Sequence, residues 1–464
     1  MKYIINCNEK ISFFCLIFRF RYVMNFDEVK IMLIKYSVSN FGSFNTPVEL
    51  RFEKGSSRQH PSHLIQNKYL TGVAIYGPNA SGKSNLLKSL FLLMQSILYG
   101  NIDMLMLNIN RHAFTDTDIT DFVISFMISE KKYEYRIKIK PSGIFSEKLE
   151  LLNDNSTPSV VFERLNNGVT FGSLLTDKWF KARDTVMDKI PYISKLRSDA
   201  IEVLDIPNKE PIIDVLKFFQ GLVFFNDKSI LNLERFYKEF KTTGFKKFLK
   251  QLLSSADVGI SDVILDEISP DLTKNLLNFV HPTSLSILNE EGGCISFINN
   301  SNDFYFIVRE NGKNVGYTLL TMHGNKKFEP KLESTGTIRL INFSLCLYMY
   351  KYSSEDTLLL IDEMDSSIHS FLVKKLLKEL LQTSNANNSQ FIVTLHNTLL
   401  MDIKEIWRDD EIWFMKKEFD HSSKLYSLAD FEPRYDKIVG KDYVNGKYGA
   451  IPFLAADLIL DNLE

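Results

Sequence analysis

Apolar and polar positions follow one another in patterns that predict both strands and helices. Residues 70–76 form a short apolar run typical of a buried strand, and residues 85–98 repeat apolar side chains at helical spacing. Residues 122–139 alternate between apolar and polar positions, which predicts an antiparallel pair of strands. Residues 147–152 and 159–165 continue this β character. The first third of the chain therefore predicts an α/β fold that includes an antiparallel β subdomain.

Helical spacing dominates the middle of the chain. Residues 177–255 repeat apolar side chains three and four positions apart, but they lack the sustained heptads of a long coiled-coil arm. Residues 263–321 return to β and loop character. Residues 338–352 predict another helix, and residues 357–363 and 390–396 predict two strands that end in polar side chains. We therefore expect a helical insertion between two α/β halves.

The turn between the first apolar strand and its helix fits the pattern G-x-x-x-x-G-K-[ST], which is typical of a phosphate-binding loop, or P-loop. Its glycines let backbone N–H groups approach a polyphosphate, and the helix N-terminus adds favourable partial charge. Lys83 would reach the β and γ phosphates of ATP, and the Ser84 hydroxyl would ligate Mg²⁺. A glycine-rich turn without a ligand is the alternative, which the flanking strand and helix disfavour. The expected nucleotide-binding residues are Gly77, Pro78, Asn79, Ala80, Ser81, Gly82, Lys83, Ser84 and Asn85.

The strand at residues 357–363 ends in two carboxylates, Asp362 and Glu363, as a Walker B motif does. Ligands in open α/β sheets bind at the carboxyl ends of the strands. Asp362 would hold Mg²⁺ directly or through water, and Glu363 would accept a proton from the attacking water. The alternative is a strand that ends in a solvated acidic turn, and the P-loop upstream favours the catalytic interpretation.

Three further motifs follow the order that ABC-type ATPases share. Residues 332–337 (LESTGT) resemble the signature motif in the variant E-S-x-G-T, which implies that Ser334 and Gly336 bind the γ-phosphate held by another subunit. A plain helix cap is the alternative, since Ser and Thr favour that position. Residues 365–369 (DSSIH) lie where a D-loop would. His396 lies at a strand end where a switch histidine would, although a structural histidine is the alternative.

Segments near both ends of the chain carry a further family pattern. They are residues 32–44 (MLIKYSVSNFGSF), 407–414 (WRDDEIWF), 423–428 (SKLYSL) and 446–452 (GKYGAIP), with 256–260 (ADVGI) and His323 as additional landmarks. Together with the motifs above, they resemble bacterial AAA-type, ABC-like ATPases of the abortive-infection AbiL class. The ATPase subunit of the PARIS phage-defence system and OLD-like proteins look similar. The resemblance covers residues 32–453.

The resemblance implies an ABC-type P-loop NTPase with a RecF- or SMC-like head, an antiparallel β subdomain and a helical insertion. It implies Mg²⁺-dependent ATP hydrolysis in a head-to-tail dimer, and a role as the sensor or scaffold subunit of an anti-phage system. Residues 397–464, which follow the switch histidine, leave no room for a nuclease domain. A toxic effector such as a TOPRIM-type nuclease would therefore be a separate partner. The implied segments are 1–31 (N-terminal extension), 32–171 (N-terminal ATPase half), 172–255 (helical insertion) and 256–464 (C-terminal ATPase half).

The chain departs from the family pattern at three places. The expected switch histidine follows Thr-Leu rather than Thr-Thr or Thr-Ser. Residues 111–114 (RHAF), where the family has its Q-loop, offer no glutamine, and Ser370 stands where proline is frequent. Three alternative functions stay open: an SMC-like DNA-repair or DNA-binding ATPase, a transporter ATPase subunit, and a non-hydrolysing nucleotide-binding scaffold. The missing coiled coil counts against the first, and the unusual signature and missing Q-loop count against the second.

Composition agrees with a cytoplasmic enzyme. Hydrophobic residues make up 45% of the 464 residues, and the formal net charge of −2 gives no indication of nucleic acid as a partner. The four cysteines form no C-x-x-C pair, which predicts reduced thiols without a metal. No apolar run reaches the roughly 18 residues that a membrane span needs. We interpret residues 1–31 as the product of a mis-assigned translation start, with Met32 as the first residue of the protein. A genuine N-terminal extension is the alternative, and a secretory signal is disfavoured because no small-residue cleavage site follows.

Overall fold

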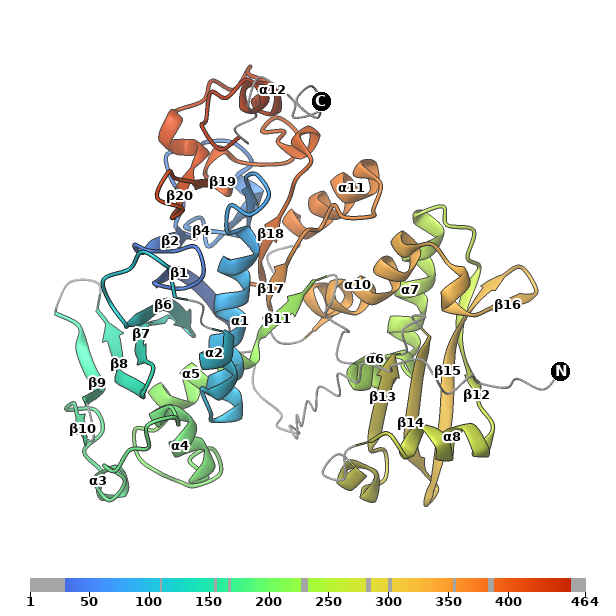
Figure 1. Ribbon diagram of the computed structural model, residues 1–464, viewed down its shortest axis with the longest axis horizontal. Helices are drawn as coiled ribbons and strands as arrows, with labels where there is room; N and C mark the ends of the chain where they lie inside the picture. The colour runs from blue at the N-terminus through green and yellow to red at the C-terminus, as the bar shows by residue number, and fades with distance from the viewer. Residues whose placement is uncertain are drawn as a thin grey trace, which may run out of the picture. The chain divides into compact units, whose positions relative to one another are not determined.

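The computed structural model describes residues 30–108, 111–153, 157–165, 168–226, 233–280, 285–298, 303–353, 356–382 and 388–451. The chain folds into two compact units, each with sheets of its own (Figure 1). The larger unit takes its described residues from 26–226, 350–365 and 369–464, and the smaller unit from 227–349 and 366–368. The expectations for residues 1–29, including Cys7 and Cys15, and for residues 452–464 fall outside the described part of the chain.

A six-stranded sheet with the order β11-β17-β18-β5-β19-β20 forms the centre of the larger unit. All neighbouring strands are parallel except β19 and β20, which are antiparallel. Strands β5, β17 and β18 are buried along their whole length, as their apolar runs predict. The strand bounds are β5 Gly72–Tyr76, β11 Leu222–Phe225, β17 Leu358–Ile361, β18 Gln390–Thr394, β19 Ile412–Lys417 and β20 Ser423–Ser427.

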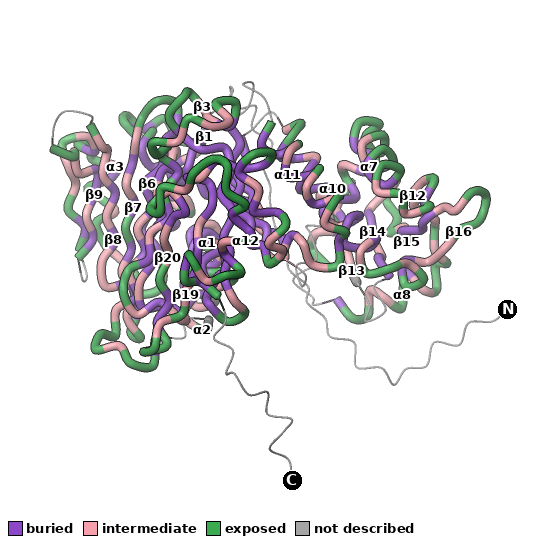
Figure 2. The backbone as a smooth tube through the Cα atoms, turned by 90° about the horizontal axis from the view of Figure 1, so that it is seen from above, coloured by how far each residue is buried: buried purple, intermediate pink, exposed green. Residues whose placement is uncertain are grey.

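The predicted antiparallel subdomain is a seven-stranded sheet with the order β10-β9-β8-β7-β6-β1-β2. One apolar core combines its inner face with α1 (Lys83–Tyr99) and with side chains of the central sheet. Figure 2 shows this core as the buried stretch around α1, β1 and β6. The strand bounds are β1 Ile31–Ser39, β2 Val48–Arg51, β6 Thr120–Ile128, β7 Lys131–Lys140, β8 Gly143–Leu152, β9 Ser159–Leu165 and β10 Gly168–Phe171.

The smaller unit consists of an antiparallel sheet and helices. Its strands have the order β12-β15-β14-β13, and β16 pairs with β15. The strand bounds are β12 Asp262–Glu267, β13 Cys294–Ile298, β14 Phe304–Glu310, β15 Lys313–His323 and β16 Lys326–Phe328. Its helices are α6 Leu233–Phe240, α7 Thr243–Ser255, α8 Pro270–Leu277 and most of α10 Thr335–Tyr352, which crosses into the larger unit after Met349.

Shorter elements complete the larger unit. The helices are α2 Asp103–Asn108, α3 Lys178–Lys181, α4 Tyr192–Ser198, α5 Glu210–Gln220, α11 Ser370–Leu381 and α12 Val439–Val444, and a two-stranded sheet pairs β3 Leu64–Ile65 with β4 Tyr69–Leu70. Within the described ranges, no helix is both long and apolar enough to cross a bilayer.

The expected helical insertion, residues 172–255, needs correction. It contains β11, which joins the central sheet as the parallel neighbour of β17. Its sequence, LVFF, has no alternation, and a short apolar run gives the same signal in a buried strand and in a buried helix. The two compact units also divide this segment, with α3, α4 and α5 in the larger and α6 and α7 in the smaller. It is therefore not one inserted domain.

Candidate nucleotide site

The candidate site lies at the carboxyl ends of four parallel strands of the central sheet. β5 leads into the P-loop, β17 into Asp362 and Glu363, β18 into His396, and β19 ends at Lys417. The carboxyl ends of parallel strands meet at one edge of a sheet, where open α/β folds bind their ligands. This arrangement brings together motifs that are separated by hundreds of residues in the sequence.

Two glycines of the P-loop are required by close packing. A Cβ atom on Gly77 would meet the carbonyl oxygen of Met415 at 2.2 Å, and one on Gly82 would meet Ser43 Oγ at 2.5 Å. Gly82 also has a φ of +108°, a conformation that L side chains rarely adopt. Without Cβ atoms at these two positions, the backbone N–H groups of the loop stay accessible where it leads into α1. A phosphate group binds to such exposed N–H groups at a helix N-terminus.

Lys83 folds back onto the loop. Its Nζ donates to the carbonyl oxygens of Gly77 at 2.7 Å and of Pro78 at 3.0 Å, and only 5% of the residue is exposed. Burial lowers the pKa of Lys83 to about 8, although the nearby carboxylates of Asp362 and Glu363 act in the opposite direction. A buried ammonium with an unfavourable environment is well placed to exchange carbonyl partners for phosphate oxygens.

The side chain of Ser81 supports the same fit. Its hydroxyl is buried and makes no hydrogen bond within the described part of the chain. A buried hydroxyl without a partner is unfavourable, and a phosphate oxygen in the loop would accept its hydrogen bond. The residues present therefore fit a bound polyphosphate.

Ser84 and Asp362 meet across the site. Ser84 Oγ donates to Asp362 Oδ1 at 3.1 Å, and Thr394 Oγ1 donates to the same oxygen at 2.7 Å. A hydroxyl and a carboxylate oxygen are the hard donors that Mg²⁺ prefers. The structure thus brings the two expected Mg²⁺ ligands together, and Thr394 fixes the carboxylate.

Glu363 and His396 form a loose pair beside the P-loop. His396 Nε2 lies 3.7 Å from Glu363 Oε1, and both side chains are partly exposed. Glu363 has a φ of +51°, and its N–H donates to Thr394 Oγ1 at 2.7 Å. A left-handed glutamate is a strained conformation of the kind found at functional sites. This backbone conformation changes the direction of the Glu363 side chain just after the end of β17.

The D-loop aspartate holds the loop that carries the histidine. Asp365 Oδ2 accepts the N–H of His396 at 2.8 Å and the N–H of Asn397 at 2.6 Å. This gives Asp365 a positioning role that its sequence position alone did not specify.

The signature residues belong to the smaller unit. Ser334 Oγ accepts the N–H of Thr337 at 3.1 Å, so Ser334 caps the first turn of α10, as the simpler alternative predicted. A Cβ atom on Gly336 would meet the carbonyl oxygen of Ser367 at 2.3 Å, which requires glycine next to the D-loop. All residues that line the pocket described below lie in the larger unit, so the structure does not test the expected phosphate contact of Ser334 and Gly336.

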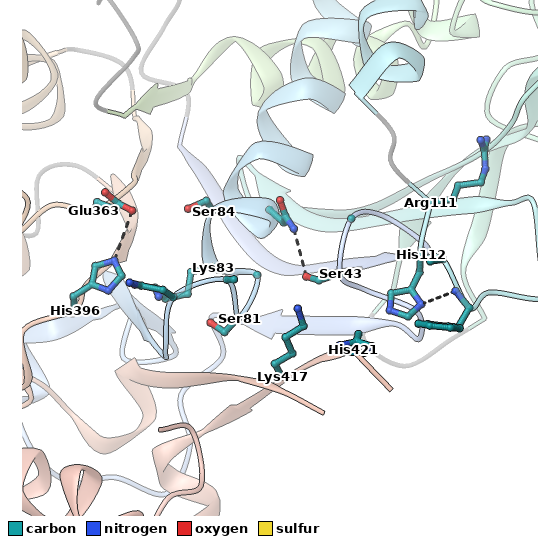
Figure 3. Close-up of a pocket in the computed structure, with 17 residues that line it drawn as sticks. Ser43, Ser81, Lys83, Ser84, Arg111, His112, Glu363, His396, Lys417 and His421 are labelled. Carbon is teal, nitrogen blue, oxygen red and sulfur yellow. Dashed lines mark hydrogen bonds and ion pairs between the residues drawn. The ribbon is translucent and has the colours of Figure 1, made fainter. Parts of the chain in front are cut away.

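An open pocket of about 630 Å³ runs along the P-loop (Figure 3). Its lining includes the expected residues Asn79, Ala80, Ser81, Gly82, Lys83, Ser84, Asn85, Glu363 and His396. It also includes residues that we did not expect as site residues, namely Gly42, Ser43, Arg111, His112, Ala113, Phe114, Lys417 and His421. The N-F-G-S-F turn at residues 40–44 and the expected Q-loop position at 111–114 had drawn attention to two of these segments. Lys417 and His421 carry no sequence motif.

Comparisons with known proteins agree with this geometry. The sequence profile of the family described as "AAA domain, putative AbiEii toxin, Type IV TA system" matches residues 73–402. No curated protein matches the chain.

Three solved structures resemble the chain distantly. The SMC head domain from Thermotoga maritima is 15% identical, with 85% of this chain and 98% of that chain covered and a TM-score of 0.37. The SMC head bound to the C-terminal winged-helix domain of ScpA is 16% identical, with coverages of 85% and 97% and a TM-score of 0.43. The recombination mediator RecF of the RecFOR pathway is 13% identical, with coverages of 85% and 98% and a TM-score of 0.37.

The structure confirms the expected α/β fold with a separate antiparallel sheet. Because the matched residues make up more than half of the 464 residues, the chain belongs to the AAA ATPase family described as "AAA domain, putative AbiEii toxin, Type IV TA system".

Proposed function

We propose that this protein is a Mg²⁺-dependent ATPase, and that it serves as the sensor or scaffold subunit of an anti-phage system that controls a separate toxic effector. The ATPase proposal rests on one observation: residues of the P-loop, Glu363 and His396 all line the same pocket. The defence role is supported by the sequence resemblance to abortive-infection ATPases and by the family description, which names a toxin system.

Phosphate binding starts with Lys83. On binding, its ammonium exchanges the carbonyl oxygens of Gly77 and Pro78 for oxygens of the β and γ phosphates. The Ser81 hydroxyl donates to the same triphosphate. Ser84 and Asp362 would hold Mg²⁺, which supplies charge neutralisation on the phosphate oxygens.

Glu363 acts on the attacking water. It accepts one proton as the water oxygen bonds to the γ-phosphorus, while the bond between that phosphorus and the β–γ bridging oxygen breaks. The products are ADP and inorganic phosphate. The Nε2 atom of His396 lies 3.7 Å from the Oε1 atom of Glu363. His396 would hold the attacking water or the γ-phosphate, while Glu363 accepts the proton.

A second copy of the chain would complete the site. By resemblance to ABC-type ATPases, Ser334 and Gly336 of that copy would contact the γ-phosphate in a head-to-tail dimer. The N-terminus of α10 supports this, because N–H groups at a helix start attract anions and α10 is 18 residues long. The exposed Ser334 leaves this end open to solvent.

Glu363→Gln tests the hydrolytic role. The change keeps the size of the side chain but removes the base, so ATP binding should persist while turnover falls at least about 100-fold. The measurements are calorimetric ATP binding and phosphate release. Glu130→Gln, in the exposed turn between β6 and β7, is the matched control and should hydrolyse ATP at the wild-type rate.

Other results would favour other functions. Wild-type turnover in Glu363→Gln would remove Glu363 as the base. If the wild-type protein binds ATP without hydrolysing it, the non-hydrolysing scaffold replaces the ATPase. A strong increase of the rate with DNA would favour the DNA-binding alternative. Loss of phage resistance in Lys83→Ala cells that carry the complete neighbouring genes would support the defence role.

A further inference from the structure

The lining of the pocket extends beyond the P-loop to residues 111–114, Lys417 and His421. In Figure 3, Glu363 and His396 lie at one end, Lys83 and Ser84 lie between, and His112 with its neighbours lies at the other. If the γ-phosphate points toward Glu363, the nucleoside of the same molecule extends toward the far end. What that end offers decides which nucleotide the site prefers.

An aromatic cluster occupies the far end. The rings of Phe114 and His421 are nearly parallel, at an interplanar angle of 20° and a centroid distance of 6.0 Å. The ring of His112 lies 5.9 Å from that of Phe114. All three residues line the pocket.

Phe114 stands out among the residues of the pocket wall. It carries the only large apolar side chain among the described residues that line the pocket, and 63% of it is exposed. A bare aromatic face in an otherwise polar pocket offers a stacking surface, and every nucleobase has a flat face that stacks on aromatic rings.

The loop that carries Phe114 is held in place by one buried side chain. Asn40 Oδ1 accepts the N–H of His112 at 3.1 Å, and Asn40 Nδ2 donates to the carbonyl oxygens of Thr117 at 2.8 Å and Ile119 at 3.1 Å. Asn40 is fully buried. The aromatic ring is thus presented by a fixed loop, which lowers the entropic cost of binding.

The turn that carries His421 is braced as well. Asp420 Oδ1 accepts hydrogen bonds from both the N–H and the hydroxyl of Ser422, at 3.0 and 2.6 Å. His421 N–H donates to the carbonyl oxygen of Glu418 at 3.1 Å. The two rings therefore come from two separately fixed segments, one after α2 and one between β19 and β20.

We propose that Phe114 and His421 form the nucleobase end of the pocket and select purine nucleotides. The base stacks on the face of Phe114 that His421 does not cover, and the two-ring surface of a purine overlaps that face more than a pyrimidine does. The inference rests on the proposed function, since it requires that the P-loop binds the triphosphate.

The test compares ligands with and without a base. ATP, CTP and inorganic tripolyphosphate, each with Mg²⁺, are titrated into wild-type protein and into Phe114→Ala. The substitution should weaken ATP binding about 5- to 150-fold, the range that loss of one base–aromatic stack produces. Affinity for tripolyphosphate should change less than about twofold, and the preference for ATP over CTP should shrink.

Two further variants make the result specific. Phe114→Trp keeps a stacking surface and should retain ATP affinity. Phe419→Ala removes a fully exposed aromatic side chain of the same β19–β20 turn that does not line the pocket, and it should bind all three ligands like wild type. His421→Ala should weaken ATP binding in the same direction as Phe114→Ala.

The outcomes separate this inference from the proposed function. If Phe114→Ala binds ATP like wild type, or loses tripolyphosphate and ATP by the same factor, the stacking role is wrong while the phosphate site stands. If wild-type protein binds neither ATP nor tripolyphosphate, the proposed function fails and the inference fails with it.

Discussion

Lys83 shows how one residue can serve binding at the expense of stability. Burial lowers its pKa to about 8, below its ordinary value of 10.5. Between these two pH values the unfolded chain holds more protons than the folded chain, so the free energy of unfolding rises with pH across that window. Below pH 8 both states are protonated, and the folded protein carries the full penalty of the buried charge, roughly 1–3 kcal/mol.

Lys83→Met should therefore have two opposite effects. It should abolish tight ATP binding, because the ammonium that faces the phosphates is gone. It should also raise the free energy of unfolding of the ligand-free protein at pH 7 by roughly 1–3 kcal/mol. Urea unfolding at pH 7 and pH 10, combined with ATP titration, checks both effects. A variant that is less stable than wild type at pH 7 would contradict this account.

At the scale of residues, sequence patterns identify site residues only where those residues lie close together in the chain. The P-loop pattern identifies Lys83 and Ser84 because the whole pattern lies within residues 77–84. Asp365, which holds the backbone of His396, and Lys417, which ends a strand beside the P-loop, depend on strand neighbours that no local pattern reveals. The order of the strands in the sheet determines which loops, distant in the sequence, line the same pocket.

Gln390 links three strands at the scale of elements. Its Oε1 accepts the N–H of Leu33 in β1 at 2.6 Å, and its Nε2 donates to the carbonyl oxygens of Leu33 at 3.2 Å and of Leu70 in β4 at 2.9 Å. All these groups are buried. One side-chain amide thus connects the antiparallel sheet to the central sheet.

Gln390→Leu should destabilise the fold by about 2–4 kcal/mol, because it leaves several buried backbone groups without partners. ATP affinity should stay near wild type, since the residue begins β18 at the end opposite the site. Denaturant unfolding measures the first effect and calorimetry the second. Gln382→Leu, an exposed change at the end of α11, is the control and should leave stability within about 0.5 kcal/mol of wild type.

The start of β1 refines the expected boundary at Met32. β1 begins at Ile31, whose N–H donates to Asp356 Oδ2 at 2.8 Å. A shortened chain that begins at Met32 should fold and bind ATP, but it should be about 2–4 kcal/mol less stable than one that begins at Lys30, because it loses both that bond and the buried Ile31 side chain. Thermal unfolding of both chains makes the comparison. An insoluble Met32 chain would show that preceding residues are needed.

Elements with a clear period were predictable, and those without one were not. The alternation at residues 122–139 specified β6 and β7, since one face of that sheet is buried. LVFF in β11, the edge strand that pairs in parallel with β17, is a four-residue apolar run too short to show a period, so the helical pattern around it prevailed in the prediction.

The proposed dimer is tested at the scale of the whole molecule. Gly336 is a poor target, because any side chain there would meet Ser367 within its own chain. Thr335, exposed in the first turn of α10, is a cleaner one. Thr335→Glu suits a helix start, so the fold should persist, but its carboxylate should repel the γ-phosphate of a partner copy. ATP binding should survive while ATP-driven dimerisation and turnover fail, and Thr335→Gln should behave like wild type.

Mixing variants extends this test. Thr335→Glu and Lys83→Ala proteins, each inactive alone, should recover roughly a quarter of the wild-type rate when mixed in equal amounts, because random pairing gives mixed dimers with one intact composite site. Phosphate release before and after mixing measures the recovery. Normal turnover of Thr335→Glu as a strict monomer, seen by light scattering, would exclude the composite site.

Helix α10 has one end in each of the two units. Its last turn is fastened to the central-sheet unit by the buried Tyr350, whose hydroxyl donates to the carbonyl oxygens of Leu380 at 3.3 Å and Ser389 at 3.1 Å. Its first turn carries the signature residues about 22 Å away, from fifteen steps of 1.5 Å. Because Ser334 and Tyr350 lie far apart along the helix, a tilt of α10 by about 10° about Tyr350 moves Ser334 by about 4 Å. That distance exceeds the length of a hydrogen bond, so in the proposed dimer a small tilt of α10 would make or break the contact between Ser334 and the γ-phosphate of the second copy.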